Sequence, residues 1–183
     1  MNWTIPGTVL QAPRQEAAHI PEQFRSMFLA GGIVLSQVSA ITGLENYTVQ
    51  NWVKRGFLTP PQNKRYTLRQ LCRIININLL KNVLPLERIC HLLEYVNGRL
   101  DDERDDTIDD SDLYFMFVGL AAHSKELYQA ERRDAVLEEA LQYYTEPVPG
   151  AKQRVKEVLR IMLTGYLAAR MTQEAENMLN KLQ

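Results

Sequence analysis

The segment TVQNWVKRGFL, residues 48–58, constrains the fold more than any other part of the chain. Numbered as a helix, it places Val49, Trp52 and Val53 on one face and polar side chains on the opposite face. The polar set is Tyr47, Gln50, Asn51 and Lys54. The pattern predicts a helix that docks its apolar face on a core and leaves its polar face free to bind something.

A shorter helix is expected just before this segment. Apolar residues recur at helical spacing over 35–41, and Gly43 suits the left-handed backbone that ends many helices. Asn46 is a candidate cap for the next helix, because its side chain can accept a hydrogen bond from a first-turn amide. Glu45 and Thr48 are alternative starts. Two helices joined by a glycine turn are typical of a helix-turn-helix.

The chain is expected to leave the second helix soon after residue 55. Gly56 is placed to end it, and Pro60 and Pro61 prevent its continuation, because proline has no amide hydrogen and a fixed φ. These residues predict a loop over 60–66.

The predicted loop carries two cations at its tip, Lys64 and Arg65, which suit contacts with phosphate groups. Thr67 is a plausible cap for a further helix from about Leu68 to Val83. We therefore expect a short basic loop between two helices.

Four stretches in this order, LSQVSAITG, TVQNWVKRGFL, KRYTLRQL and LPLERICHLL, resemble the winged helix-turn-helix of MerR-type transcriptional regulators and the related excisionase-like modules. The resemblance covers roughly residues 33–97. The matching positions are Leu35, Val38, Ile41, Thr42, Gly43, Thr48, Val49, Trp52, Gly56, Arg65, Tyr66 and Leu71. The resemblance implies that the chain belongs to a bacterial family built around this module.

The resemblance implies that helix 46–55 enters the major groove of double-stranded DNA and that loop 60–66 contacts the backbone. The implied DNA-binding residues are Tyr47, Thr48, Gln50, Asn51, Lys54, Arg55, Lys64, Arg65 and Tyr66. Trp52 and Tyr66 are interpreted first as core anchors of this module. Where many MerR-type proteins have an Arg-Tyr pair in the helix, this chain has Gln50 and Asn51, so base preference does not transfer.

Charge is distributed unevenly along the chain. Its net charge is only -1, but residues 33–99 hold nine Lys or Arg against three Glu. Residues 101–112 hold eight acidic residues against one Arg. A basic lobe attracts a polyanion. The acidic stretch is interpreted as a solvated linker over 100–111; the alternative is that it competes with DNA for the basic face.

The rest of the chain is expected to be helical, so the predicted fold class is all-α. We expect four parts: an N-terminal arm over 1–32, a DNA-binding domain over 33–99, the linker over 100–111, and a helical domain over 112–183. In the last domain we expect helices over about 112–128, 132–144 and 151–170, with Thr172 capping a final short helix. The first two could form one bent helix. We expect a homodimer through these C-terminal helices, without a long heptad seam.

Aromatic residues of the C-terminal half are interpreted as packing residues; the alternative is a pocket for an unknown small-molecule or protein effector. They are Tyr114, Phe115, Phe117, Tyr128, Tyr143, Tyr144 and Tyr166. In the arm, a short helix over 22–29 is expected to pack on the body or to cross to a partner chain.

Cys72 and Cys90 lack metal-ligand spacing and are interpreted as buried free thiols. We expect no catalytic site, cofactor or metal, no membrane span, and a cytoplasmic location. The sequence favours a sequence-specific DNA-binding transcriptional regulator. The alternatives are a protein-interaction adaptor that does not bind DNA and an excisionase-like architectural DNA-binding protein.

Overall fold

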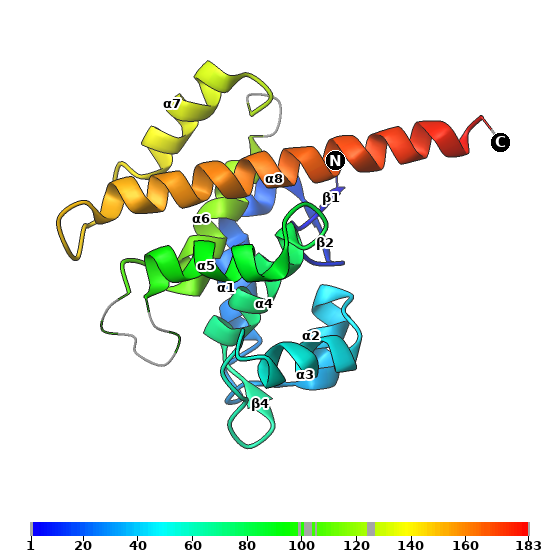
Figure 1. Cartoon of the computed structure of the whole chain (residues 1–183), viewed down its shortest axis with the longest axis vertical. Coiled ribbons are helices and arrows are strands. Elements are labelled where there is room, and N and C mark those ends of the chain that lie inside the picture. The colour runs from blue at the N-terminus through cyan, green and yellow to red at the C-terminus, as the bar shows by residue number, and fades with distance from the viewer. Residues whose placement is uncertain (1, 99, 101–103, 105, 124–126, 183) are drawn as a thin grey trace.

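The computed structural model describes residues 2–98, 100, 104, 106–123 and 127–182, and it is mostly helical (Figure 1). The expected all-α class is confirmed at this level. The helices are η1 (Arg14–His19), α1 (Ile20–Ser26), α2 (Leu35–Thr42), α3 (Asn46–Lys54), α4 (Leu68–Leu80), α5 (Leu86–Asn97), α6 (Asp110–Ala122), α7 (Ala130–Ala140) and α8 (Ala151–Asn180). The strands β1 (Asn2–Thr4) and β2 (Gln11–Pro13) pair antiparallel, as do β3 (Ile33–Val34) and β4 (Arg65–Tyr66).

Helix α4 lies at the centre of the molecule. Every residue from Leu71 to Ile77 is buried, because α2, α5, α6 and α8 all pack against this helix. Its N-terminus is capped as predicted: the Gln70 amide donates to Thr67 Oγ1, and Gln70 Oε1 accepts from the Thr67 amide. One apolar core runs from the N-terminal arm through α4 to α8.

Helices α4 and α8 cross in very close contact at Gly165. A Cβ atom built on Gly165 would lie 2.7 Å from Leu80 Cδ2 and 3.3 Å from Val83 Cγ2. A larger residue at Gly165 would therefore have to displace the tips of the Leu80 and Val83 side chains at the end of α4 and just beyond it.

Helices α2 and α3 meet at the predicted glycine turn. Gly43 has φ 72°, and its amide donates to the Ser39 carbonyl. Beyond α3, the segment 62–65 forms a tight hairpin in which Asn63 and Lys64 both have positive φ, 48° and 61°. Positive φ at both central residues is typical of a type I′ turn, whose twist matches that of paired strands. Figure 1 shows the hairpin projecting beside α3.

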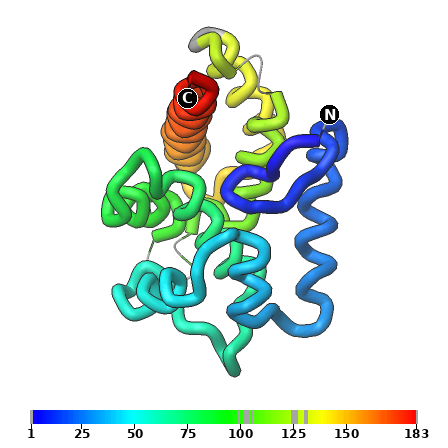
Figure 2. Tube along the Cα trace, turned by 90° about the vertical axis from the view of Figure 1, so that its right-hand side faces the viewer, coloured from blue at the N-terminus to red at the C-terminus, as the bar shows by residue number. Residues whose placement is uncertain are grey.

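The N-terminal arm packs on its own chain. Phe24 of α1 contacts the rings of Tyr114 and Phe115 on α6, with centroids 5.8 and 5.9 Å away. The Tyr114 hydroxyl donates to the Pro6 carbonyl at 2.9 Å. The expected helix over 22–29 is found at Ile20–Ser26, and Figure 2 shows this arm running along one side of the molecule.

The expectation of a solvated linker over 100–111 is wrong for residues 106–110. Thr107, Ile108 and Asp110 are buried, and α6 begins at Asp110 and packs along α4. The acidic residues 101–103 and 105 lie outside the described residues. The acidic segment therefore does not separate two independent cores, because Asp side chains within it find arginine partners on α4.

Two helix boundaries in the C-terminal half differ from expectation. The first two predicted helices are separate but shorter, at Asp110–Ala122 and Ala130–Ala140. Thr172 does not cap a last helix: α8 runs unbroken to Asn180, and Thr172 Oγ1 donates to the Ala168 carbonyl one turn earlier. Gly150, with φ 82°, precedes α8 at the predicted break.

Candidate nucleic-acid interface

The polar face of α3, formed by Tyr47, Gln50, Asn51 and Lys54, is exposed as its spacing predicts. Tyr47 is 71% exposed. On the opposite face Val49 and Trp52 are buried, Val53 is half-buried, and together they anchor the helix. The face therefore offers a phenol, two amides and an ammonium group on a fixed support. Thr48 is half-buried at its edge.

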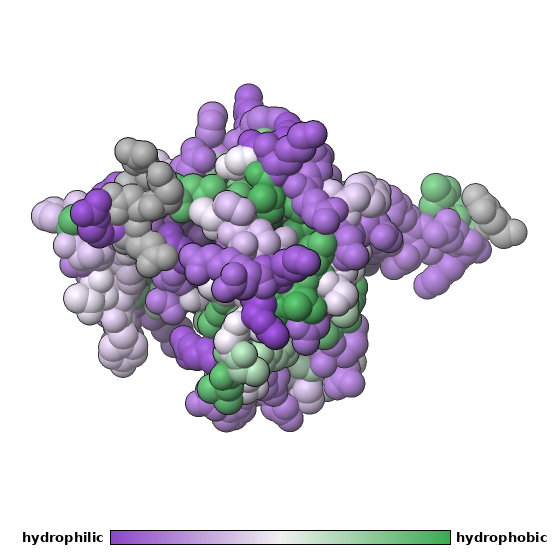
Figure 3. Space-filling view, turned by 90° about the horizontal axis from the view of Figure 1, so that it is seen from below, coloured by the Kyte–Doolittle hydropathy of each residue, from purple (hydrophilic) through white to green (hydrophobic). Residues whose placement is uncertain are grey.

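A hollow of about 540 Å³ separates α3 from the 62–65 hairpin. We call it the hairpin hollow; it is lined by Val34, Leu35, Ser36, Gln50, Val53, Pro61, Lys64 and Tyr66. Gln50 and Lys64 thus border the same depression, although they come from different elements. Figure 3 views the molecule from the hairpin side, where hydrophilic side chains surround small hydrophobic patches.

The loop that carries the hairpin is held to α4. Gln70 Nε2 donates to the Thr59 carbonyl at 3.0 Å and to the Pro60 carbonyl at 3.1 Å. Because Gln70 also takes part in the cap of α4, one side chain fixes the base of the hairpin relative to the central helix.

The other candidate cations already have partners within the chain. Arg55 Nη2 lies 2.5 Å from Glu87 Oε1 on α5, and its guanidinium stacks over Phe57. Arg65 Nη1 donates to the Gly32 carbonyl at 2.9 Å, so it also ties the hairpin to β3. Both side chains remain exposed, whereas Lys54 and Lys64 have no described ion pair.

Two local expectations are wrong. Tyr66 is only 3% exposed, which confirms its interpretation as a core anchor, so its inclusion among the DNA-binding residues is wrong. Asn46 does not cap α3: the helix begins at Asn46 itself, after Glu45. The Asn46 side chain instead accepts a hydrogen bond from Ser39 Oγ at 2.6 Å and so joins α2 to α3.

A buried ionic network links the end of α3 to α6. Arg73 Nε donates to the Phe57 carbonyl at 3.1 Å, and Arg73 Nη1 lies 3.6 Å from Asp110 Oδ2. Arg69 Nη2 lies 2.6 Å from Asp106 Oδ2. Burial raises the pKa of Asp110 to about 6, against the opposing effect of Arg73 and Arg69. The described acidic residues of 106–110 therefore contact α4 arginines and not the polar face of α3.

The sequence analysis did not identify this network. The available signal was Arg69 and Arg73, two cations four residues apart on a helix that has no other charged residue. They are spaced to face one partner surface.

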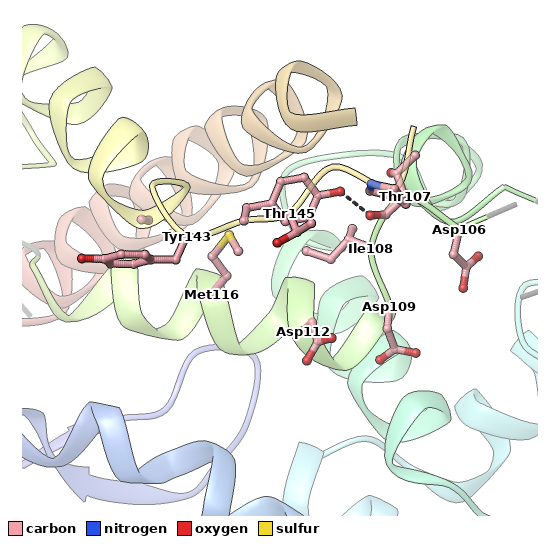
Figure 4. Close-up of a pocket in the computed structure, with 11 residues that line it drawn as sticks. Asp106, Thr107, Ile108, Asp109, Asp112, Met116, Tyr143 and Thr145 are labelled. Atoms are coloured by element: carbon pink, nitrogen blue, oxygen red, sulfur yellow. Dashed lines mark hydrogen bonds between the residues drawn. The ribbon is translucent and has the colours of Figure 1, made fainter. Parts of the chain in front are cut away.

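A second hollow, of about 680 Å³, lies between α6 and the segment after α7. Its lining includes Asp106, Asp109 and Asp112 from the segment before α6 and its first turn, and Tyr143 and Tyr144 from the segment after α7. Figure 4 shows Tyr143 on the far side of the hollow from Asp106 and Asp109. The Tyr144 hydroxyl donates to the Thr107 carbonyl across it. Of the aromatic set, Tyr114 and Phe117 are core residues, as the packing interpretation expects.

Cys72 and Cys90 are free and buried, as expected. Burial raises the pKa of Cys72 well above its ordinary value and that of Cys90 to about 11. Both thiols are therefore protonated near neutral pH and poorly reactive.

Residues 33–117 match a protein family described as a domain of unknown function, DUF1836. The match includes α2 to α5, crosses the acidic segment and ends within α6, so it includes both sides of the Arg73–Asp110 contact. Comparison with the curated proteins and with the solved structures gave no match. In the described part of the chain, no helix is both long and apolar enough to cross a membrane.

Proposed function

We propose that this chain is a sequence-specific DNA-binding transcriptional regulator with a MerR-like winged helix-turn-helix, in which α3 enters the major groove and the 60–66 hairpin follows the backbone. The observation that carries the proposal is the exposed polar face of α3 beside Lys64 at the tip of the hairpin. Side-chain amides hydrogen-bond base edges, and lysines contact phosphates.

The surface charges also favour a nucleic acid. Lys54 lies on the same helix face as Gln50 and Asn51, Lys64 borders the hairpin hollow together with Gln50, and Arg55 and Arg65 are also exposed. The described acidic residues of 106–110 face α4, so they do not mask this surface. A homodimer through the C-terminal helices would present two α3 helices to a pseudo-palindromic site. The hollow beside Tyr143 and Tyr144 is the place where an effector would bind.

The adaptor function remains the second candidate, because the hairpin hollow is lined mainly by apolar side chains such as Val34, Leu35 and Val53. A protein partner would insert an apolar side chain there. Such a complex would respond little to salt, whereas a DNA complex would respond strongly.

Selection of bound fragments from a random DNA pool at several salt concentrations tests the proposal. We expect a defined site to be enriched. If Lys54 and Lys64 of two copies neutralise four phosphates, affinity should fall on the order of 100-fold between about 50 and 200 mM salt. Absence of binding to any duplex at low salt would refute DNA recognition.

Single variants separate the roles within this surface. Gln50→Ala or Asn51→Ala should relax base preference at a defined position, at a cost of about 1–3 kcal/mol in binding the preferred site. Lys64→Ala should weaken binding to all sequences nearly equally and reduce the salt slope. The roles are wrongly assigned if both kinds of change reduce base preference equally.

A further inference from the structure

The polar face of α3 carries two side-chain amides that have no partner within the described chain. Gln50 and Asn51 are both exposed, and no hydrogen bond among the described residues involves either side chain. The two arginines near them are already engaged, because Arg55 pairs with Glu87 and Arg65 donates to the carbonyl just before β3. The amides are therefore available to a ligand on this face.

The chemistry of an amide selects one base over the others. Its adjacent donor and acceptor match the N6 donor and the N7 acceptor that adenine presents in the major groove. Guanine presents two acceptors there, which a bidentate amide does not match and which arginine or lysine usually binds. Gln50 and Asn51 are consecutive, so they point in different directions from the helix and address different base pairs. The two amides thus favour adenine at two positions.

An apolar wall lies beside one of these amides. Gln50 lines the hairpin hollow together with Val34, Leu35 and Val53. Val53 follows Gln50 by three residues, a spacing that makes two side chains neighbours on the helix surface, with Cβ atoms about 5–6 Å apart. Among the described residues that line the hollow, Lys64 is the one charged group, and it lies on the hairpin. The hollow is therefore an apolar wall with a positive rim.

An A·T pair presents the groups that match this arrangement. In the major groove its edge carries adenine N7 and N6 and, toward the other strand, the C5 methyl group of thymine. Apolar side chains are the usual contacts of that methyl group, which the other natural bases of DNA lack. An amide next to an apolar side chain can therefore recognise both halves of one pair.

We propose that Gln50 and Val53 together read one A·T pair, Gln50 through adenine and Val53 through the thymine methyl group, and that Asn51 reads a second adenine. This inference rests on the proposed function. It names the class of DNA bound: duplexes with A·T pairs where α3 enters the major groove.

Charge complementarity favours a DNA strand over a protein segment as the occupant of the hairpin hollow. A thymine methyl group lies close to the phosphates of its own strand, and Lys64 stands at the rim that the strand would pass. Lys54, on the same helix as Val53, is exposed as well. Figure 1 shows α3 and the hairpin at the same end of the molecule, so one duplex can contact both.

Replacement of thymine by uracil tests the methyl contact without altering the protein, because uracil pairs with adenine and lacks only the methyl group. In the site selected from the random pool, we expect A·T pairs at the positions where Gln50→Ala and Asn51→Ala relax base preference. Uracil in the pair that Gln50 reads should lower the affinity about four-fold for each half-site, as expected for one buried methyl group at about 0.8 kcal/mol. Fluorescence anisotropy at one fixed salt concentration measures the change.

Val53→Thr tests the protein side of the contact. Threonine has the shape of valine but replaces one methyl group by a hydroxyl, so thymine and uracil should then bind about equally well. The salt dependence should stay that of the wild type, because no cation is changed. Val136→Thr is the matched control: Val136 is also half-buried, but it lies on α7, at the other end of the molecule from α3, and this variant should keep the preference for thymine. Thermal unfolding would check that both variants are folded.

Three results would each overturn the inference: G·C pairs at the two relaxed positions, uracil bound as well as thymine by the wild type, or a folded Val53→Thr variant that still prefers thymine. In each case the chain binds a defined site, so the proposed function stands. The uracil measurement uses the wild-type chain, and its result holds even if Val53→Thr does not fold. A chain that binds no duplex at low salt refutes the proposed function and this inference with it.

Discussion

Arg73→Met is expected to lower the free energy of unfolding by about 3–5 kcal/mol at pH 8, because it leaves the buried Asp110 carboxylate without its closest described cation. Arg73 and Asp110 side chains are only 4% and 1% exposed. The substitution also removes the hydrogen bond to the Phe57 carbonyl at the end of α3. Urea denaturation followed by tryptophan fluorescence measures the loss.

The loss is expected to be smaller at pH 5. Burial raises the pKa of Asp110 from 3.8 to about 6, so the folded protein binds this proton more tightly than the unfolded chain. The stabilising contribution of that proton is fully present below about pH 3.8 and is lost as the pH rises through about 6. Without Arg73 the carboxyl stays protonated to higher pH, so at pH 5 little charge is left unpaired.

Arg25→Met is the matched control. Arg25 Nη2 lies 3.8 Å from Asp112 Oδ1, and both side chains are more than half exposed. Solvent screens such a pair, and the expected loss is below about 1 kcal/mol. Equal losses in the two variants, or a loss for Arg73→Met that does not change with pH, would show that Asp110 is not the group responsible.

Trp52→Ala is expected to lower the free energy of unfolding by about 3–5 kcal/mol, because it opens a cavity under α3. Trp52 is 5% exposed, whereas Tyr47, on the opposite side of the same helix, is 71% exposed. Tyr47→Ala should change stability by no more than about 0.5 kcal/mol.

The two variants should weaken DNA binding for different reasons, Tyr47→Ala by removing a contact and Trp52→Ala by unfolding part of the protein. Tyr47→Ala should weaken binding at 25 °C in a protein that is as stable as the wild type. Trp52→Ala should reduce binding in proportion to the fraction unfolded, and lower temperature or a stabilising osmolyte should recover it. Tyr47→Ala with unchanged affinity for the selected site would remove this residue from the proposed interface.

Local sequence patterns predicted the elements that position the candidate site. The alternation of Val49 and Trp52 with Gln50 and Asn51 identified both faces of α3, because burial on a helix follows its own periodicity. Gly43 and the Thr67 cap were predictable for the same reason: each acts through atoms within a few residues along the chain.

Features that depend on distant residues were not predictable from those patterns. In the sequence, Asp110 is one of several acidic residues in a row, and nothing nearby singles it out. Only the folded chain places it next to Arg73, which lies 37 positions earlier. Tyr66 was interpreted first as a core anchor and was implied as a DNA-binding residue only by resemblance; its position in β4, paired with Ile33, places it in the core. The end of α8 was misjudged because Thr172 also hydrogen-bonds within a continuing helix.

The glycine contact between α4 and α8 has a geometric consequence. Because Gly165 has no Cβ, α8 approaches the side chains of Leu80 and Val83 closely, and a larger residue at this position would have to displace them. Helix α8 therefore packs directly on α4, the same helix that anchors the hairpin through Gln70. In the proposed homodimer through the C-terminal helices, the packing of α8 on α4 would contribute to the separation of the two α3 helices, and so to the spacing between half-sites.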